Sequence, residues 1–281
     1  GAAWLSERLL GFAASRSLPQ WRRDWFRGAA EVPAPAPTAG AEVVLLADTF
    51  NTYFEPENLR AAVRVLTAAG YRVHVPRPQG DSRPLCCGRT YLASGMLDEA
   101  RAEASRMLAT LAPYVRRGVP VIGLEPSCLL GLRDELKALL PGADTAALAG
   151  AALLFEEFLV REHKAGRLSL PLRRSSYRRA LVHGHCHQKA FGVMPAVLGA
   201  LKLVPDLAVD TITSSCCGMA GSFGYAAEHV AVSLQMAEAN LLPAVRKADA
   251  ETVVVADGTS CRHQIRDGAA RDALHVARVL A

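Results

Sequence analysis

Long apolar runs and blocks of like charge are both missing from this sequence of 281 residues. No apolar run approaches the roughly 18 residues that a membrane-spanning helix requires, so we expect no transmembrane segment. Charged residues make up 21% of the chain and give a net charge of +5, yet they form only scattered pairs such as Arg22–Arg23 and Arg178–Arg179. Such pairs are typical of a solvated surface and do not indicate binding to nucleic acid.

Several catalytic and cofactor-binding motifs are also missing. The sequence contains no G-x-G-x-x-G after its first predicted strand, no P-loop and no G-x-S-x-G turn, which argues against a nucleotide site or a serine hydrolase. It lacks the C-x₂-C-x₂-C-x₃-C run of bacterial ferredoxins. It also lacks a signal-peptide cleavage pattern and an initiator Met, so we expect a cytoplasmic protein that is either a piece cut from a longer polypeptide or a chain with a processed tag.

What is present is an odd number of cysteines, seven, in a chain large enough to fold without disulfides. In a reducing compartment, such cysteines are expected to bind a metal or to do redox chemistry. Half of the residues are apolar, which is typical of globular domains. We expect an N-terminal amphipathic helix with a Pro/Ala linker (1–40), a first lobe (41–142), connecting helices (143–174) and a second lobe (175–281).

Both lobes alternate short β-branched runs with helical stretches. In the first lobe the pattern predicts strands over 42–50, 71–76 and 119–126, a helix over 56–70 and about 25 helical residues ending at Gly118. In the second lobe it predicts strands over 179–186, 208–214 and 252–261, and helices over 194–204 and 229–248. This repetition indicates an internal duplication. The predicted fold is α/β, with two pseudo-repeated Rossmann-like βαβαβ lobes and parallel sheets.

Every cysteine lies at the C-terminal end of a predicted strand or in the loop that follows one. A CCG triplet occurs once in each lobe, at 86–88 and 216–218, and a further cysteine follows each pair after 41 (87 to 128) or 44 (217 to 261) positions. The carboxyl edge of a parallel sheet is where ligands bind. Backbone N–H groups of the next helix stabilise thiolates there.

The two lobes offer different numbers of thiols. The second lobe provides four candidate ligands, which are Cys186, Cys216, Cys217 and Cys261. The first lobe provides three, which are Cys86, Cys87 and Cys128, with Asp48 near the position where Cys186 falls in the repeat. Four thiolates suffice for an iron–sulfur cluster, so the first lobe is one short.

Disulfide formation and zinc binding are the alternatives. A Cys216–Cys217 bridge would be strained, because neighbouring Cα atoms lie about 3.8 Å apart and disulfides prefer roughly 4.4–6.8 Å. Zinc sites usually use C-x₂₋₄-C pairs, which are missing here. We expect His183, His185 and His187 on one face of a strand, opposite Cys186. His185 and His187 are the better candidates for contacts to a bound group, and His263 is a weaker one.

These motifs resemble a known family. The two CCG units, with "DTFNTYFEPENLRAAVRVLTAAGYRVHVP", "GLEPSCLLGLRDEL", "LVHGHCHQKA" and "VADGTSCRHQI", are similar to the cysteine-rich CCG domain and to the C-terminal region of fused FAD-linked oxidases. The B subunits of heterodisulfide reductase and iron–sulfur subunits of glycolate oxidase share this domain. The fuller family pattern has a leading cysteine in each half and a closing C-x-x-C, where this chain has Asp48 and Gln264.

The resemblance implies a function and a set of site residues. It implies a cluster of the 4Fe-4S type held by Cys186, Cys216, Cys217 and Cys261, with Cys86, Cys87 and Cys128 as further candidates. Gly88 and Gly218 would let the backbone approach the sulfurs, and His185 and His187 would surround them.

The chain would relay electrons from an upstream FAD domain and ferredoxin-like clusters of the same polypeptide to an unidentified acceptor. FAD itself would bind outside this chain. A homo-oligomer and peripheral membrane association are left open. Two alternatives remain: a structural zinc-binding interaction module, and a thiol–disulfide oxidoreductase that uses the CC pairs.

Overall fold

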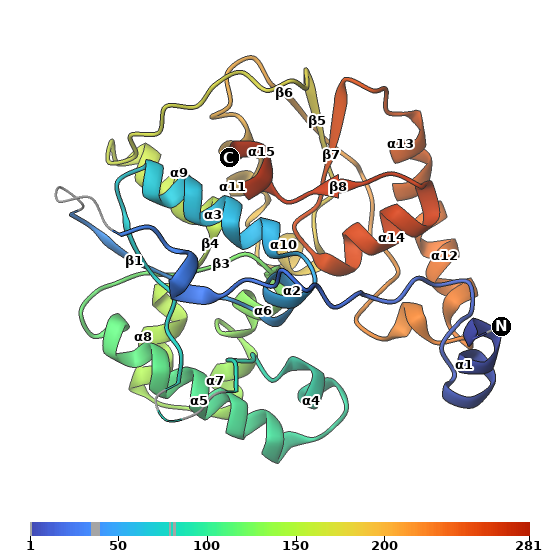
Figure 1. Cartoon of the computed structure of the whole chain (residues 1–281), viewed down its shortest axis with the longest axis horizontal. Helices are drawn as coiled ribbons and strands as arrows, with labels where there is room; N and C mark the ends of the chain where they lie inside the picture. Colours follow the sequence, from blue (N-terminus) through green and yellow to red (C-terminus); the bar gives the residue numbers. More distant parts are fainter. Residues whose placement is uncertain (1, 35–39, 79, 81–82) are drawn as a thin grey trace. The chain divides into compact units, whose positions relative to one another are not determined.

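The computed structural model describes residues 2–34, 40–78, 80 and 83–281 (Figure 1). The described residues form two compact units. The first lobe comprises residues 21–172 with the last two residues of the chain, and the second lobe comprises residues 2–20 and 173–279. Each lobe contains one four-stranded parallel sheet with helices, which confirms the predicted α/β fold.

The sheet of the first lobe has the strand order β2-β1-β3-β4, with every neighbouring pair parallel. Its strands are β1 (Glu42–Leu45), β2 (Arg72–His74), β3 (Val121–Gly123) and β4 (Ala152–Leu154). Side chains of β1 and β3, such as Val44 and Ile122, are fully buried, as expected for the central strands of a parallel sheet covered on both faces. The helices are η1 (Gly28–Glu31), α2 (Thr49–Tyr53), α3 (Pro56–Ala68), α4 (Arg89–Ala93), α5 (Leu97–Val115), α6 (Pro126–Gly131), α7 (Glu135–Leu139), α8 (Ala143–Ala151) and α9 (Phe155–Lys164).

The sheet of the second lobe repeats this order as β6-β5-β7-β8, again all parallel. Its strands are β5 (Arg179–Val182), β6 (Ala208–Thr211), β7 (Thr252–Val255) and β8 (Ala273–Leu274). The helices are α1 (Ala2–Leu10), α10 (Cys186–Ala190), α11 (Met194–Leu201), η2 (Phe223–Tyr225), α12 (Val230–Glu238), α13 (Leu241–Lys247), α14 (Thr259–Ala269) and α15 (Val276–Leu280). The matching strand orders confirm the predicted pseudo-repeat.

Two helices predicted as continuous are broken in the structure. The helical stretch before Gly118 is divided into α4 and α5, and Gly95 between them has a φ of 75°. The stretch over 229–248 is divided into α12 and α13. Pro243 explains the second break, because it has no N–H to donate to Ala239 and its ring would collide with that carbonyl in a continuous helix.

Two strands were not predicted. β4 lies inside the segment 143–166, which the sequence predicted as helices only, and β8 has two residues. The Ala and Leu residues of β4 also suit a helix, so only pairing with β3 reveals it as a strand.

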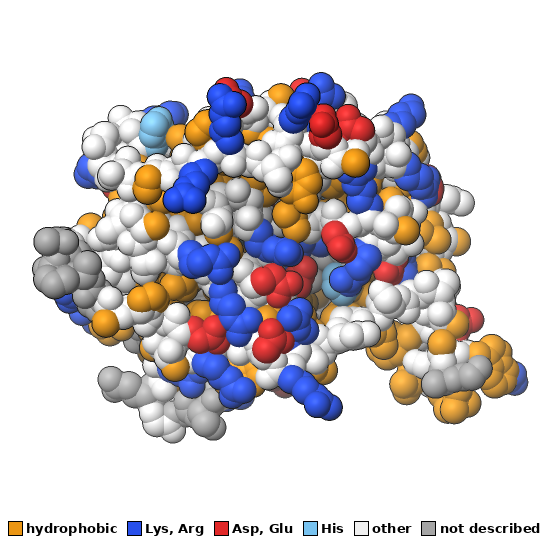
Figure 2. All heavy atoms as spheres, turned by 45° about the horizontal axis from the view of Figure 1, so that its top comes forward, with side chains coloured by type: hydrophobic (Ala, Val, Ile, Leu, Met, Phe, Trp, Pro, Cys, Tyr) orange, Lys and Arg blue, Asp and Glu red, His pale blue; other side chains and the backbone are white. Residues whose placement is uncertain are grey.

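The N-terminal segment is less helical than predicted, because α1 ends at Leu10 and Gly11 follows with a φ of 73°. Beyond Gly11 the backbone pairs with the segment before α12: Ala13 donates to the carbonyl of Tyr225 (2.8 Å). Apolar side chains of α1 are exposed (Figure 2, lower right), including Trp4, which is 56% exposed. Within the predicted linker 32–40, residues 35–39 lie outside the described part of the chain.

Candidate metal centre

The strand register shows which residues of the two lobes are equivalent. Leu45 of β1 pairs with Ile122 of β3, and Val182 of β5 pairs with Val255 of β7. Counting from these pairs, Cys128 and Cys261 are equivalent, since each is the third residue of the helix that follows the pairing strand. The predicted position of the cysteines at the carboxyl edge of each sheet is therefore confirmed.

The same register shows that the first-lobe position equivalent to Cys186 lies one residue after Asp48, the residue that the sequence pattern predicted for it. Asp48 and His185 are both N-cap residues, of α2 and α10 respectively. Cys186 is the first residue of α10, and its equivalent in the first lobe is Thr49, the first residue of α2. The carboxylate of Asp48 instead accepts hydrogen bonds from the backbone and side chain of Asn51, at 3.0 and 2.7 Å.

In the second lobe, three separate loops bring four thiols into one group. Cys186 contacts Cys216, Cys216 contacts Cys217, and Cys217 contacts Cys261. Cys217 and Cys261 are buried, whereas Cys186 and Cys216 are partly exposed. The group thus has one side in the protein interior and another side open to solvent.

The glycine of each CCG turn brings its backbone N–H to a cysteine sulfur. Gly218 has a φ of 90° and donates its N–H to Cys216 Sγ at 3.3 Å. Gly88 has a φ of 74° and donates to Cys86 Sγ at 3.5 Å. A side chain at Gly218 would also collide with the backbone carbonyl of Ser233 on α12. Only glycine suits this position without strain, because its φ lies in the left-handed region.

The thiols of the second lobe differ in how readily they ionise. The pKa of Cys216 is strongly lowered because hydrogen bonds from Cys186 and Cys217 stabilise its thiolate. The pKa of Cys261 is also well below its ordinary value, mainly because of Cys217 and secondly because of nearby His183. The pKa values of Cys186 and Cys217 are raised, mainly because each thiol forms a hydrogen bond with a neighbouring sulfur that favours its protonated form. Four thiols this close cannot all ionise unless a cation lies among them, and a bound metal would supply that charge.

The first lobe holds a smaller thiol group. Cys87 Sγ lies 3.3 Å from Cys128 Sγ, and Cys86 contacts Cys87. The pKa values of all three thiols are raised, with contact to another sulfur or burial as the cause. The nearby carboxylates of Asp48 and Glu125 further disfavour a thiolate at Cys128. All three thiols of this group therefore favour the protonated form.

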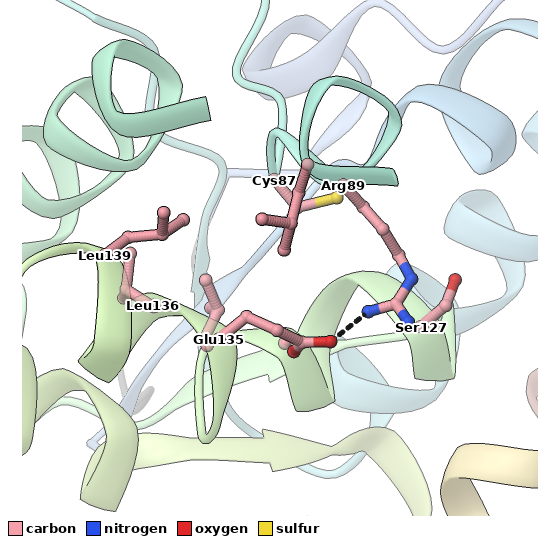
Figure 3. Close-up of a pocket in the computed structure, with 9 residues that line it drawn as sticks. Cys87, Arg89, Ser127, Glu135, Leu136 and Leu139 are labelled. Atoms are coloured by element: carbon pink, nitrogen blue, oxygen red, sulfur yellow. Dashed lines mark hydrogen bonds and ion pairs between the residues drawn. The ribbon is translucent and has the colours of Figure 1, made fainter. Parts of the chain in front are cut away.

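A hollow of about 300 Å³ opens beside Cys87 in the first lobe. Figure 3 shows Arg89 and Glu135 paired across it, with their atoms 2.6 Å apart. The remaining lining is mostly apolar and includes Leu136 and Leu139. Because Glu135 balances the charge of Arg89, the hollow has no strong preference for a charged ligand.

The predicted arrangement of the histidines is wrong. β5 ends at Val182, so His185 and His187 do not lie on a strand: His185 caps α10 and accepts a hydrogen bond from the N–H of His187 at 3.2 Å. Their rings stack, with centroids 5.2 Å apart. His185 lies near enough to Cys216 and Cys261 to lower the pKa of both thiols. His263 forms a 2.9 Å hydrogen bond with Tyr225 Oη.

His183 lies closer to the thiols than expected from the sequence, and it is 1% exposed. Its ring and the sulfurs of Cys217 and Cys261 each offer a ligand atom, and these three atoms lie within 4.8 Å of one another. The signal was present in the sequence, because His183 is the first residue after a buried strand at the ligand-binding edge. Assigning it to the strand concealed this position.

Comparison with known proteins agrees with this geometry. Residues 180–266 match the model of the cysteine-rich CCG domain. The chain is 29% identical over 255 residues to the C subunit of anaerobic glycerol-3-phosphate dehydrogenase from Escherichia coli K12, a match that covers 89% of this chain and 61% of that protein. It is 26% identical to D-2-hydroxyglutarate dehydrogenase of Pseudomonas putida KT2440, over the whole of this chain and 27% of that protein.

A third relative is lactate utilization protein A of Bacillus velezensis FZB42, 26% identical over 76% of this chain and 85% of that protein. The chain thus spans under two thirds of the first two relatives. Among the described residues, no helix has both the length and the apolar character needed to cross a membrane. The chain carries a cysteine-rich CCG domain at residues 180–266 and is homologous to the C subunit of anaerobic glycerol-3-phosphate dehydrogenase, to D-2-hydroxyglutarate dehydrogenase and to lactate utilization protein A.

Proposed function

We propose that this chain is the iron–sulfur electron-transfer part of a flavin-linked 2-hydroxy-acid oxidoreductase. The observation that carries the proposal is the group of four thiols at the carboxyl edge of the second sheet. The relatives of this chain, which are subunits or larger forms of dehydrogenases, support the same assignment.

The residues of the second lobe fit a cluster of the 4Fe-4S type, which is usually held by four cysteine thiolates. Cys186, Cys216, Cys217 and Cys261 would be the ligands. Such a cluster, when bound, supplies one-electron transfer. The N–H of Gly218 already donates to Cys216 Sγ, and donors of this kind stabilise anionic sulfur. Burial of Cys217 and Cys261 keeps water from one side of the group, and partial exposure of the other two leaves a side for electron entry.

His185 and His187 would tune this site without binding iron. His185 packs against the backbone at Gly258, which begins the helix that carries Cys261. A side chain at Gly258 would run into the His185 ring. The imidazole therefore links α10 to α14, so that the loops of Cys186 and Cys261 are held together.

Cys86, Cys87 and Cys128 would form a second, weaker centre in the first lobe, with Gly88 in the role of Gly218. An upstream FAD-binding domain and ferredoxin-like clusters would supply electrons, and the acceptor stays unidentified. By this division of labour, the isolated chain has no dehydrogenase activity. Turnover of D-lactate or D-2-hydroxyglutarate with an artificial dye by this chain alone would contradict the proposal.

A zinc module is the second candidate, because His183, Cys217 and Cys261 each offer a ligand atom and these atoms lie within 4.8 Å of one another. Together with a further thiol they would give the Cys₃His set of structural zinc sites. Anaerobic purification followed by metal and acid-labile sulfide analysis separates the candidates. Iron with sulfide supports the electron-transfer function, zinc alone supports the module, and neither leaves thiol chemistry at the CC pairs.

A further inference from the structure

His183 has a fixed backbone and a fully enclosed ring. It follows the last residue of β5, and its N–H donates to the carbonyl of Val255 at 2.8 Å, which extends the pairing of β5 with β7 by one step. The side chain is 1% exposed. The backbone bond and the burial together leave the imidazole little freedom to turn.

The two ring nitrogens of His183 have different surroundings. Nδ1 lies 2.9 Å from the hydroxyl oxygen of Ser214, two residues before Cys216. Nε2 is buried and has no nitrogen or oxygen atom as a hydrogen-bond partner among the described residues. The side chain of Cys261 hydrogen-bonds to the His183 ring, so the buried ring has a sulfur as its neighbour on this side, and this choice of partner calls for an explanation.

The surroundings of His183 supply that explanation. The sulfurs of Cys217 and Cys261 lie within 4.8 Å of its ligand nitrogen and of each other. Histidines that bind metals typically hydrogen-bond through one ring nitrogen to an oxygen and present the other nitrogen to the metal. Ser214 and the two sulfurs reproduce both halves of this arrangement around one imidazole.

Another feature of the lobe leaves room for a nitrogen ligand. Gln264, three residues after Cys261 in the first turns of α14, holds the position of the closing cysteine in the C-x-x-C pattern. Its Nε2 donates to the carbonyls of Cys217 and Ser233, at 2.8 and 3.0 Å. Gln264 therefore ties the CCG loop to α12 through its amide nitrogen, and no thiolate is available at this position of the lobe.

The first lobe differs from the second at the positions of His183 and Cys186. By strand register, the equivalent of His183 is Leu46, whose N–H donates to the carbonyl of Ile122 as that of His183 does to Val255. The first lobe thus has a hydrocarbon side chain where the second lobe has an imidazole, next to a thiol group that also lacks the equivalent of Cys186. The imidazole occurs only beside the fuller set of thiols.

We propose that His183 Nε2 is an iron ligand of the cluster in the second lobe, with Ser214 as the positioning residue that fixes its tautomer. For Nε2 to bind a metal, Nδ1 must carry the proton and donate it to Ser214 Oγ. This inference rests on the proposed iron–sulfur function. It gives the imidazole the place of one of the four thiolates, because a cluster of the 4Fe-4S type takes four protein ligands and histidine replaces cysteine where it binds such iron.

The test is pulsed electron paramagnetic resonance of the anaerobically reconstituted, reduced protein with ¹⁵N-labelled histidine. Wild-type protein should show the strong hyperfine coupling of a directly coordinated nitrogen. His183→Gln should lose this coupling, whereas His187→Gln, the matched histidine control in the same lobe, should keep it. A wild-type cluster without such coupling, or a coupling that survives in His183→Gln, would overturn the assignment.

Two further variants guard against a simple loss of folding. His183→Cys should keep the iron content and lose the nitrogen coupling, and its reduction potential should fall, because imidazole ligands raise the potential of a cluster relative to thiolates. Ser214→Ala should weaken iron retention about 10- to 100-fold, the usual effect of removing such a partner, while exposed Ser215→Ala leaves it unchanged. An unchanged potential in His183→Cys, or equal retention in the two serine variants, would contradict the role of His183.

Iron and sulfide analysis of the wild-type protein keeps the two proposals apart. A cluster without histidine coupling refutes only the ligand assignment. Wild-type protein that binds no iron or sulfide, or only zinc, refutes the proposed function and this inference together.

Discussion

The two lobes share a strand order, a CCG turn and a cysteine in the first turn of a following helix, but they differ in the side chains around that frame. At the register of Cys186 the first lobe has Thr49, and at that of His183 it has Leu46. Two thiols of the second lobe, Cys216 and Cys261, have strongly lowered pKa values, whereas all three in the first lobe have raised values. A duplicated fold can therefore keep its backbone geometry while only one copy keeps the complete ligand set.

The largest expected effect is the loss of the cluster on removing a thiol from the second lobe. Cys216→Ser should abolish the charge-transfer absorbance of the anaerobically reconstituted protein, because it removes one of the thiols that would hold the cluster. Cys86→Ser, the equivalent change in the first lobe, should leave most of the absorbance. Equal losses in both variants would show one shared centre and would contradict the assignment to separate lobes.

A reverse experiment sharpens the same comparison. Thr49→Cys introduces a thiol at the register of Cys186, so it should raise the iron bound by the first lobe in the Cys216→Ser background. Asp48→Cys, one residue earlier at the N-cap, serves as the control and should give a smaller gain. If Asp48→Cys binds more iron than Thr49→Cys, then the register-based equivalence is wrong.

The next effect concerns the glycines of the two CCG turns. Gly218→Val should reduce cluster occupancy strongly, because its φ of 90° and the carbonyl of Ser233 both oppose a side chain. Backbone strain of this kind costs about 1–3 kcal/mol, and we expect the lobe to stay folded because its sheet does not depend on this turn. Gly88→Val should have the smaller effect on iron content and stability, since its Cβ would lie 3.2 Å from the carbonyl of Ala100, whereas a Cβ at Gly218 would lie much closer to that of Ser233. Iron content and thermal unfolding measure both effects, and a Gly218→Val protein with full iron content would contradict the role of the turn.

The smallest effect is a dependence of stability on pH that belongs to the first lobe. Arg167 and Arg161 lower the pKa of buried Glu162 below its ordinary value of 4.5, with hydrogen bonds as the main cause. Because the folded-state pKa is lowered, this contribution to stability is present above the ordinary pKa and is lost as the pH falls through the folded-state value. Glu162→Gln should therefore flatten the acid side of a plot of unfolding free energy against pH. An unchanged slope would show that Glu162 does not contribute.

Much of the fold follows from local sequence signals. α3 begins at Pro56 and ends just before Gly70, which has a φ of 85°, so both ends can be predicted from residue type. The positive φ of both CCG glycines was equally predictable from the need to turn two neighbouring sulfurs toward one point. These features depend on a few adjacent residues, and the sequence shows them directly.

Features that depend on pairing between distant segments were harder to predict. The position of Thr49 opposite Cys186 becomes clear only from the register of β1 with β3 and of β5 with β7. His183 was assigned to a strand that ends one residue earlier, and this hid its approach to Cys217 and Cys261. An error of one residue changes which way a side chain points, so the ligand types were predicted better than their arrangement.

The most direct test of the central claim is anomalous X-ray scattering from crystals of the anaerobically reconstituted protein, recorded on both sides of the iron absorption edge. The account predicts iron among the sulfurs of Cys186, Cys216, Cys217 and Cys261, at the carboxyl edge of the β6-β5-β7-β8 sheet. Anomalous signal at the zinc edge alone, or no metal signal among these four sulfurs, would contradict it.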